Sequence, residues 1–372
     1  MAVTTIHRPT KAIISRQAIK HNIQQEIERL SKDTELFAVV KANAYGHGLV
    51  EVAKTAKEAG ATGFCVAYLD EALALRKAGI TEPILVLGVL EPVNDVVLAA
   101  KNDISLTVAS NDWLERAQNI LQKEQLQVKI HIAIDSGMGR IGYADEKDIQ
   151  YAISLLRHNE YFVIEGIFTH FATADEVDDS YFHQQQETFA KFYQMFPFDF
   201  HYIHTANTAT ALWHKAWHSN MIRFGIGLYG MNPSGQVIAE PYHLQPAMKL
   251  VTEIVFVKEM PKGKSISYGA TYTTKSSEWI ATLPIGYADG LWRRYTGFEL
   301  LVDGQRCPIV GRVCMDQVMI KLPKYYPVGT EVVIIGQSQD EVNTFEMAAE
   351  HIGTINYELA CAISQRVSRI YK

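Results

Sequence analysis

The chain has 372 residues, more than one hydrophobic core usually supports, so we expect two domains. Hydrophobic residues make up 48% and charged residues 20% of the sequence, as in ordinary globular proteins, and the net charge of −6 without a basic block argues against nucleic acid or an anionic membrane surface as the principal partner. The N-terminus lacks the pattern of a secretory signal, and no apolar run approaches the roughly 20 residues that span a bilayer, so we expect a soluble, cytoplasmic protein.

Short apolar runs alternate with amphipathic stretches from about residue 35 to residue 223. The candidate strands are Leu36–Val40, Gly63–Val66, Ile84–Leu87, Ser105–Val108, Val128–Ile134, Phe162–Ile167, Phe200–His204 and Met221–Phe224, and helix-like segments between them include Gly48–Glu58, Asp70–Ala78, Asn111–Lys123 and Asp178–Met195. Eight such units favour parallel strands closed into a (β/α)8 TIM-type barrel, although a doubly wound sheet produces a similar alternation. We assign this barrel to residues 11–240.

Beyond residue 240 the strands are short and punctuated by Gly and Pro. The candidates are Met248–Phe256, Trp279–Pro284, Glu299–Val302, Cys307–Val310, Gln317–Lys321 and Thr330–Ile335, with one late helix at Thr344–Ile352. This pattern predicts a smaller, mostly β C-terminal domain over residues 241–372. The four cysteines are scattered without a CxxC pair, so we expect buried, reduced thiols and no metal site.

The segment Val39-Val-Lys41-Ala-Asn-Ala-Tyr45-Gly-His-Gly48 places a lysine where an apolar strand ends. Strand C-termini face the active site of a barrel, and a partly desolvated lysine there is a candidate Schiff-base former. A surface lysine at a strand end is the plainer interpretation of Lys41. The glycines favour function only modestly, by letting backbone N–H groups approach an anion.

Further polar residues follow the later strands in chain order. The turn Gly137-Met-Gly139-Arg140 could aim a guanidinium at a carboxylate or phosphate, or Arg140 could pair with Asp135. Thr169 to Glu176, His204 to Thr208 and Arg223-Phe-Gly225-Ile-Gly227 then close three successive strands. Polar groups gathered at one end of successive strands are typical of barrel enzymes, and Thr208 with Gly225 and Gly227 could offer donors to a phosphate.

Three loops stand out in the β domain, namely Ser267-Tyr268-Gly269, Ile285 to Gly290 and Val313 to Gln317. Tyr-Gly pairs in loops are often packing features. A tyrosine with an ordinary pKa of ~10 is a poor base at neutral pH, so a catalytic Tyr268 would need a nearby cation.

Together these segments resemble the alanine racemase family, and the resemblance runs through nearly the whole chain. The matching segments occur in the family's order: Lys41 to Gly48, Thr169 to Glu176, Arg223 with Gly225, Ser267-Tyr268-Gly269, Gly286-Tyr287, Met315-Asp316 and Tyr357. The family's barrel and β domain agree with the strand pattern above. The resemblance also implies that residues 1–10 join the β domain.

The resemblance implies an isomerase that interconverts L-alanine and D-alanine with pyridoxal 5'-phosphate and supplies D-alanine for peptidoglycan. Lys41 would hold the cofactor as an internal aldimine and exchange a proton on one face of the substrate Cα, while Tyr268 of the partner subunit would act on the other face. The active unit would therefore be a homodimer with shared sites. The remaining implied contacts are Tyr45, His170, Asn207, Thr208, Arg223, Gly225, Ile226 and Tyr357 for the cofactor, and Arg140, Tyr287, Met315 and Asp316 for the substrate.

Two of these contacts are given a special role by the resemblance. Arg223 would donate to the pyridine nitrogen and keep it unprotonated, which weakens the electron sink and limits side reactions. His170 would lie beside Arg223 and tune Tyr268. One departure from the family is Ala133, which stands where many members carry a carbamylated lysine that anchors the arginine equated with Arg140. A bound anion such as chloride, or another side chain, would have to orient Arg140 instead.

Other functions remain open on the sequence alone. A broad-specificity racemase would need a roomier pocket near Tyr287 and Tyr357. A basic amino-acid decarboxylase on the same scaffold would carry an acidic residue in place of Arg223 and usually a catalytic cysteine, for which Cys314 is a faint candidate. A non-catalytic carrier would lack the β domain, and a Schiff-base aldolase would leave Arg223 without a role.

Overall fold

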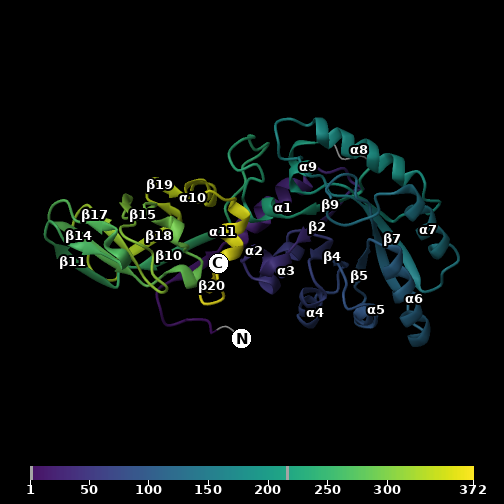
Figure 1. The fold of residues 1–372 in the computed structure, drawn as a ribbon, viewed down its shortest axis with the longest axis horizontal. Coiled ribbons are helices and arrows are strands. Elements are labelled where there is room, and N and C mark those ends of the chain that lie inside the picture. Colours follow the sequence, from purple (N-terminus) through teal and green to yellow (C-terminus); the bar gives the residue numbers. More distant parts are fainter. Residues whose placement is uncertain (1–2, 215–217) are drawn as a thin grey trace. The chain divides into compact units, whose positions relative to one another are not determined.

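The computed structural model describes residues 3–214 and 218–372, and the chain divides into two compact units. We call residues 19–44 and 49–244 the barrel unit, and residues 1–18, 45–48 and 245–372 the β unit. Figure 1 labels the helices and strands of both.

The barrel unit is built on an eight-stranded parallel sheet with the order β8-β7-β6-β5-β4-β3-β2-β9. A parallel bridge between Ala206 and Ile222 brings the β8 side of the sheet to β9 and closes it, which confirms the expected barrel. The strands are β2 (Glu35–Val39), β3 (Gly63–Val66), β4 (Ile84–Val89), β5 (Ser105–Val108), β6 (Val128–Ala133), β7 (Phe162–Phe168), β8 (Tyr202–His204) and β9 (Met221–Phe224).

Helices alternate with these strands, as Figure 1 shows. They are α1 (Arg16–Ile27), α2 (Lys41–Tyr45), α3 (Leu49–Glu58), α4 (Leu69–Lys77), α5 (Val96–Lys101), α6 (Asn111–Glu124), α7 (Glu146–Leu156), α8 (Ser180–Tyr193) and α9 (Thr208–Trp213), with 3-10 turns η1 (Val93–Asp95) and η2 (Ile226–Tyr229). Local sequence explains their ends: the Ser110 hydroxyl caps α6, and the Asp145 carboxylate accepts two backbone N–H bonds at the start of α7. Strands such as β3 are buried throughout because helices cover a parallel sheet.

The β unit contains a seven-stranded sheet in which β16-β15-β18-β10-β1-β20 are neighbours and β19 pairs with β18. A three-stranded sheet β11-β14-β17 and the hairpin β12-β13 complete it. Its strands are β1 (Lys11–Ile14), β10 (Met248–Glu253), β11 (Phe256–Met260), β12 (Ser265–Ile266), β13 (Tyr272–Thr273), β14 (Glu278–Leu283), β15 (Glu299–Val302), β16 (Gln305–Pro308), β17 (Val318–Leu322), β18 (Glu331–Ser338), β19 (Glu341–Asn343) and β20 (Ser368–Tyr371), and its helices are η3 (Tyr268–Ala270), η4 (Tyr287–Asp289), η5 (Arg293–Tyr295), α10 (Phe345–Ile352) and α11 (Asn356–Ala362).

The structure differs from the expected elements at several places, and strands β12, β13, β19 and β20 were not predicted. Residues 11–14, which we placed in the barrel domain, form β1 between β10 and β20 in the β unit. The expected strand Met248–Phe256 divides into β10 and β11, because the Ile254 N–H bonds to Thr330 whereas the Val255 N–H bonds to Thr282 of another sheet. A second late helix, α11, was not predicted.

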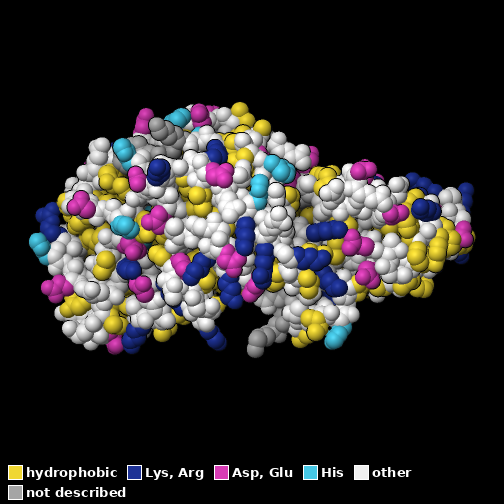
Figure 2. Space-filling model, turned by 180° about the vertical axis from the view of Figure 1, so that it is seen from behind, with side chains coloured by type: hydrophobic (Ala, Val, Ile, Leu, Met, Phe, Trp, Pro, Cys, Tyr) yellow, Lys and Arg dark blue, Asp and Glu magenta, His cyan; other side chains and the backbone are white. Residues whose placement is uncertain are grey.

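The cysteine expectation holds only in part. Cys65 and Cys307 are buried, Cys314 is partly exposed and Cys361 is exposed, all as free thiols. In the face that Figure 2 presents, acidic and basic side chains are interspersed. None of the helices over the described residues is both long and apolar enough to cross a membrane.

Candidate active site

Lys41 lies two residues after the end of β2, at the carboxyl end of a buried strand. The next four residues, Ala42 to Tyr45, all have positive φ, between 50° and 54°. The turn marked α2 in Figure 1 is therefore left-handed beyond Lys41. Left-handed backbone in non-glycine residues concentrates at functional sites, which supports a functional role for Lys41.

Arg223, in β9, is 4% exposed and lies among acceptors. One guanidinium nitrogen donates to the His204 ring Nδ1 at 2.8 Å and to the His204 carbonyl at 2.7 Å, and the other donates to the Thr169 carbonyl at 2.9 Å. Burial lowers the pKa of Arg223 to about 10, so the guanidinium stays charged at neutral pH.

His170 lies beside Arg223, as expected, with its Nδ1 atom 3.4 Å from the guanidinium. Burial lowers the pKa of His170 well below its usual value, and the positive charges of Arg223, Arg140 and Lys41 lower it further. The imidazole is therefore neutral and accepts from Arg223. The barrel unit thus brings three of the expected cationic residues within electrostatic reach of one histidine.

A chain of buried polar groups extends from Arg223 into the barrel. His204 Nε2 lies 2.8 Å from His131 Nδ1, and His131 Nε2 lies 3.0 Å from a carboxylate oxygen of Glu165. Because Arg223 can only donate, His204 must accept through Nδ1 and donate through Nε2, and His131 must then donate to Glu165. The Ser105 hydroxyl also donates to Glu165, at 2.5 Å.

The pKa values agree with this direction of donation. Burial lowers the pKa of both His131 and His204, so both rings are neutral. For Glu165, burial opposes ionisation, but the bonds from His131 and Ser105 prevail and its pKa is lowered. The carboxylate is therefore the charged end of a chain that begins at the Arg223 cation.

Arg140 is exposed, and within the described residues it forms no ion pair with a carboxylate. The alternative partner Asp135 instead accepts from the backbone N–H groups of Gly137 and Gly139, at 3.0 Å each. Asp135 therefore shapes the turn that presents Arg140. Ala133, the departure from the family, is buried in β6.

The expected phosphate contacts are neighbours in the barrel unit. The Thr208 hydroxyl accepts from the Gly225 N–H at 2.8 Å, and Asn207 caps α9 by accepting from the Thr210 N–H. A Cβ atom on Gly227 would lie 2.9 Å from the Thr208 methyl and 2.7 Å from the Phe224 ring, so this close approach requires glycine. Ile226 begins the following 3-10 turn η2.

The β unit holds the other expected residues. Tyr45 and Tyr357 lie with their ring centroids 6.2 Å apart. Tyr268 is 71% exposed and lines an open pocket of about 520 Å³ with Met315 and Asp316. The Asp316 carboxylate is paired with Arg366 at 2.7 Å.

Tyr287 lies against the Met315 loop through backbone bonds. The Tyr287 N–H donates to the Cys314 carbonyl and the Ala288 N–H donates to the Met315 carbonyl, at 3.0 and 3.1 Å. The fully buried Asp289 anchors this loop by accepting two bonds from Arg8, at 2.9 and 2.6 Å. The β unit therefore gathers Tyr268, Tyr287 and Met315 as three partly or largely exposed apolar side chains.

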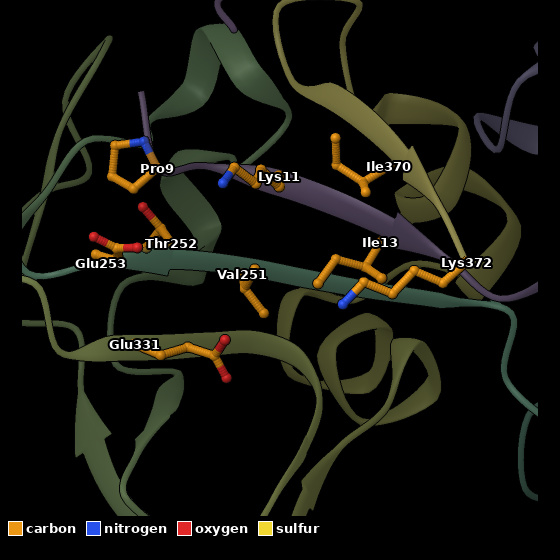
Figure 3. A pocket seen from close by; sticks show the side chains of 9 residues that line it. All are labelled: Pro9, Lys11, Ile13, Val251, Thr252, Glu253, Glu331, Ile370 and Lys372. Atoms are coloured by element: carbon orange, nitrogen blue, oxygen red, sulfur yellow. The ribbon is translucent and has the colours of Figure 1, made fainter. Parts of the chain in front are cut away.

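A second pocket of the β unit, of about 260 Å³, lies over β1, β10, β18 and β20. Figure 3 shows its charged lining, including Lys11, Glu253, Glu331 and Lys372. None of the residues expected at the active site lines it, so we leave it outside the candidate site. No group of three or more His, Cys, Asp or Glu suited to a metal ion occurs in the described parts of the chain.

Sequence reasoning missed His131, Glu165 and the Arg8–Asp289 pair. The first two carried a signal, because a histidine lies within the apolar end of β6 and a glutamate interrupts the otherwise apolar β7. No local pattern links Arg8 to Asp289, since 281 positions separate them.

The chain matches known family models and proteins over nearly all of its length. Residues 14–233 match the alanine racemase N-terminal domain and residues 247–371 the alanine racemase C-terminal domain. An alanine racemase of Pediococcus pentosaceus is 56% identical over 369 residues, which cover 99% of this chain and 98% of that protein. A crystal structure of alanine racemase from E. faecalis is 49% identical with a TM-score of 0.96 and full coverage of both chains.

Relatives with another name share the fold. A histidine racemase of Leuconostoc mesenteroides is 34% identical, with a TM-score of 0.93 and full coverage of both chains. The two domain matches and the 56% identity nevertheless all indicate alanine racemase relatives. This chain belongs to the alanine racemase family.

Proposed function

We propose that the protein interconverts L-alanine and D-alanine by exchanging protons on opposite faces of the substrate Cα, with pyridoxal 5'-phosphate as cofactor. The carrying observation is the arrangement around His170, where a buried Arg223 and the charges of Arg140 and Lys41 act on one neutral imidazole. Membership of the alanine racemase family makes this the function that fits best. The cellular role we propose is supply of D-alanine for peptidoglycan in the cytoplasm.

The residues present fit the cofactor. The Thr208 hydroxyl accepts from the Gly225 N–H and so keeps its own proton to donate to a phosphate, beside the backbone of Ile226. Gly227 allows the close packing of Thr208 against Phe224 that holds this hydroxyl in place. Arg223 offers a guanidinium that does not readily release its proton, as a pyridine nitrogen kept unprotonated would need. When bound, pyridoxal phosphate withdraws electrons from the substrate Cα and lets its proton leave.

Two residues of this chain exchange protons with the substrate Cα. The Lys41 amine takes or returns a proton on one face of Cα, and the phenol oxygen of Tyr268 does so on the other. Inversion requires both, because a proton removed and returned by one group on one face restores the starting enantiomer. Tyr45 and Tyr357 support the phosphate, and Asn207 holds the turn at Thr208.

The substrate carboxylate is received by Arg140 and the Met315 backbone, beside Asp316. An anion such as chloride near Arg140 takes over the orienting role that Ala133 cannot fill. Tyr287 and Tyr357 narrow the entry and favour a side chain as small as a methyl group. Because the histidine racemase shares this fold, substrate choice must come from such lining residues.

We propose a homodimer whose sites each combine Lys41 of one subunit with Tyr268 of the partner subunit. The exposure of Tyr268 and Met315 supports this assembly, since large apolar side chains that cluster at a surface commonly mark an interface.

The test is isotope exchange in D₂O with each enantiomer, with and without added cofactor. We expect deuterium at Cα of both alanines, conversion of each to the other, and a visible absorption band that borohydride removes. Decarboxylation of lysine or arginine without alanine exchange would identify the decarboxylase, and equal turnover of histidine and alanine would identify the broad-specificity racemase. A bound cofactor without any Cα exchange would identify the non-catalytic carrier.

A mixing experiment tests the shared sites. Inactive Lys41→Ala chains and inactive Tyr268→Phe chains should together regain activity, because one site of each heterodimer holds both intact residues. Persistent inactivity after proven subunit exchange would contradict sharing.

A further inference from the structure

The turn that follows Lys41 has an energetically unfavourable backbone conformation. Ala42, Asn43 and Ala44 have φ of 53°, 54° and 53°, and Tyr45 follows at 50°. Non-glycine residues disfavour this region because Cβ crowds the following carbonyl oxygen, and consecutive residues there are rarer still. Such a segment persists only when its surroundings hold it.

Glu71 makes contact with this turn directly after Lys41. One carboxylate oxygen of Glu71 accepts from the Ala42 N–H at 2.7 Å. The other oxygen accepts from the N–H groups of Ala67 at 2.8 Å and Tyr68 at 3.4 Å, in the loop that leads into α4. Since β2 and β3 are adjacent in the sheet, one carboxylate ties together the carboxyl ends of two neighbouring strands.

Other bonds hold the flanks of the turn. The Asn43 side chain accepts from the Leu49 N–H at 2.9 Å, the Ala44 N–H donates to the Val40 carbonyl at 2.8 Å, and the Tyr229 hydroxyl donates to the Val39 carbonyl at 2.9 Å. The Glu71 bond differs from these in holding the amide next to the lysine.

We propose that Glu71 is a positioning residue that fixes the left-handed turn and thereby aims the Lys41 amine. The inference rests on the function proposed for Lys41. A carboxylate can accept from the Ala42 N–H with one oxygen and from the Ala67 and Tyr68 N–H groups with the other. An amide side chain has only one oxygen, and its NH₂ group is a donor.

This difference gives a selective variant. Glutamine also serves at the third position of a helix, so Glu71→Gln can keep its oxygen on Ala67 and Tyr68 while its NH₂ group faces the Ala42 N–H. Glu71→Ala removes both acceptors. The matched control is Asp148→Asn, which neutralises a carboxylate at the same position of α7, within that helix's first turn.

The first measurement is hydrogen exchange of the folded apoprotein, followed in peptides that contain residues 41–45 and residues 69–77. We expect Glu71→Gln to speed exchange in residues 41–45 by about tenfold, as loss of one hydrogen bond implies, with residues 69–77 unchanged. In Glu71→Ala both segments should exchange faster, and in Asp148→Asn neither should. Unchanged exchange of residues 41–45 in both Glu71 variants would overturn the proposal.

The second measurement separates positioning from structure in the cofactor-loaded protein. If Lys41 is displaced in Glu71→Gln, kcat should fall about tenfold while KM for alanine stays within about twofold. In Glu71→Ala, kcat should be lowered as well. A change of KM alone would overturn the positioning role. If Lys41→Ala retained Cα exchange, the proposed function would fail, whereas the exchange result for the Glu71 turn would stand by itself.

Discussion

The two units place their candidate functional groups in opposite ways. In the barrel unit, Arg223 is 4% exposed and reaches a carboxylate only through two buried imidazoles. In the β unit, Tyr268 is 71% exposed and Met315 is 53% exposed. The residues on either side of Tyr268 have positive φ, 64° at Ser267 and 74° at Gly269.

This difference in burial indicates which substitutions should lower stability and which should lower activity alone. A buried, bonded group costs free energy when it is removed, because its partners are left unsatisfied. An exposed side chain in a single chain can be changed without such a cost. We therefore expect substitutions in the barrel network to lower stability and substitutions at the exposed tyrosine to lower activity alone.

The largest expected effect is that of Tyr268→Phe. Losing one acid/base group should lower racemisation about 10²- to 10⁴-fold, while the free energy of unfolding changes by less than about 0.5 kcal/mol because the phenol is exposed. Steady-state racemisation and urea unfolding of the same preparation measure both quantities.

Tyr325→Phe is the matched control, since Tyr325 is 54% exposed in the same unit and has no proposed role. It should leave both quantities unchanged. A Tyr268→Phe protein that racemises alanine at the normal rate would show that the exposed tyrosine of the β unit is not an acid/base group.

The next effect is that of Glu165→Leu in the barrel network. Leucine leaves the His131 N–H without its acceptor, so we expect a loss of about 1–3 kcal/mol in the free energy of unfolding. Glu165→Gln should lose less, because its oxygen can still accept from His131 and Ser105. Glu160→Leu, at an exposed site, should change little, and equal losses in all three variants would argue against a network.

The sequence predicted the barrel strands well because each is a short buried run between helices that bury one face. It could not predict that β1 lies outside the barrel, since the partners of Lys11–Ile14 are strands more than 200 positions away, β10 and β20. The strand break at Ile254 and Val255 likewise depends on two distant partners, Thr330 and Thr282.

The candidate site was predictable where chemistry follows a strand end, as with Lys41 and Arg223. It was not predictable where a charge acts through other residues. Glu71 appeared only as part of a helix, because its function depends on a turn 29 positions earlier. The left-handed backbone of Ala42 and Ala44 has no sequence signal, because alanine ordinarily favours the right-handed helix.

A pH dependence of stability should also come from the barrel unit. Burial lowers the pKa of His131, His170 and His204, with the Arg223 charge contributing to each, so the folded rings stay neutral. The unfolded rings bind protons below about pH 6.5, and the unfolded state then holds more protons than the folded state. Stability must therefore fall as the pH drops through 6.5, approaching about 1.4 kcal/mol per pH unit for each histidine.

Urea unfolding at pH 7.5, 6.5 and 5.5 measures this slope. Replacing one neutral ring by an amide, in His170→Gln, should reduce the slope below pH 6.5 by about one proton, whereas the exposed His158→Gln should leave it unchanged. A wild-type slope that stays flat down to pH 5.5 would mean that the three rings take up protons in the folded state. The His204 ring nitrogen could then no longer accept from Arg223, and the direction assigned to the buried chain would be wrong.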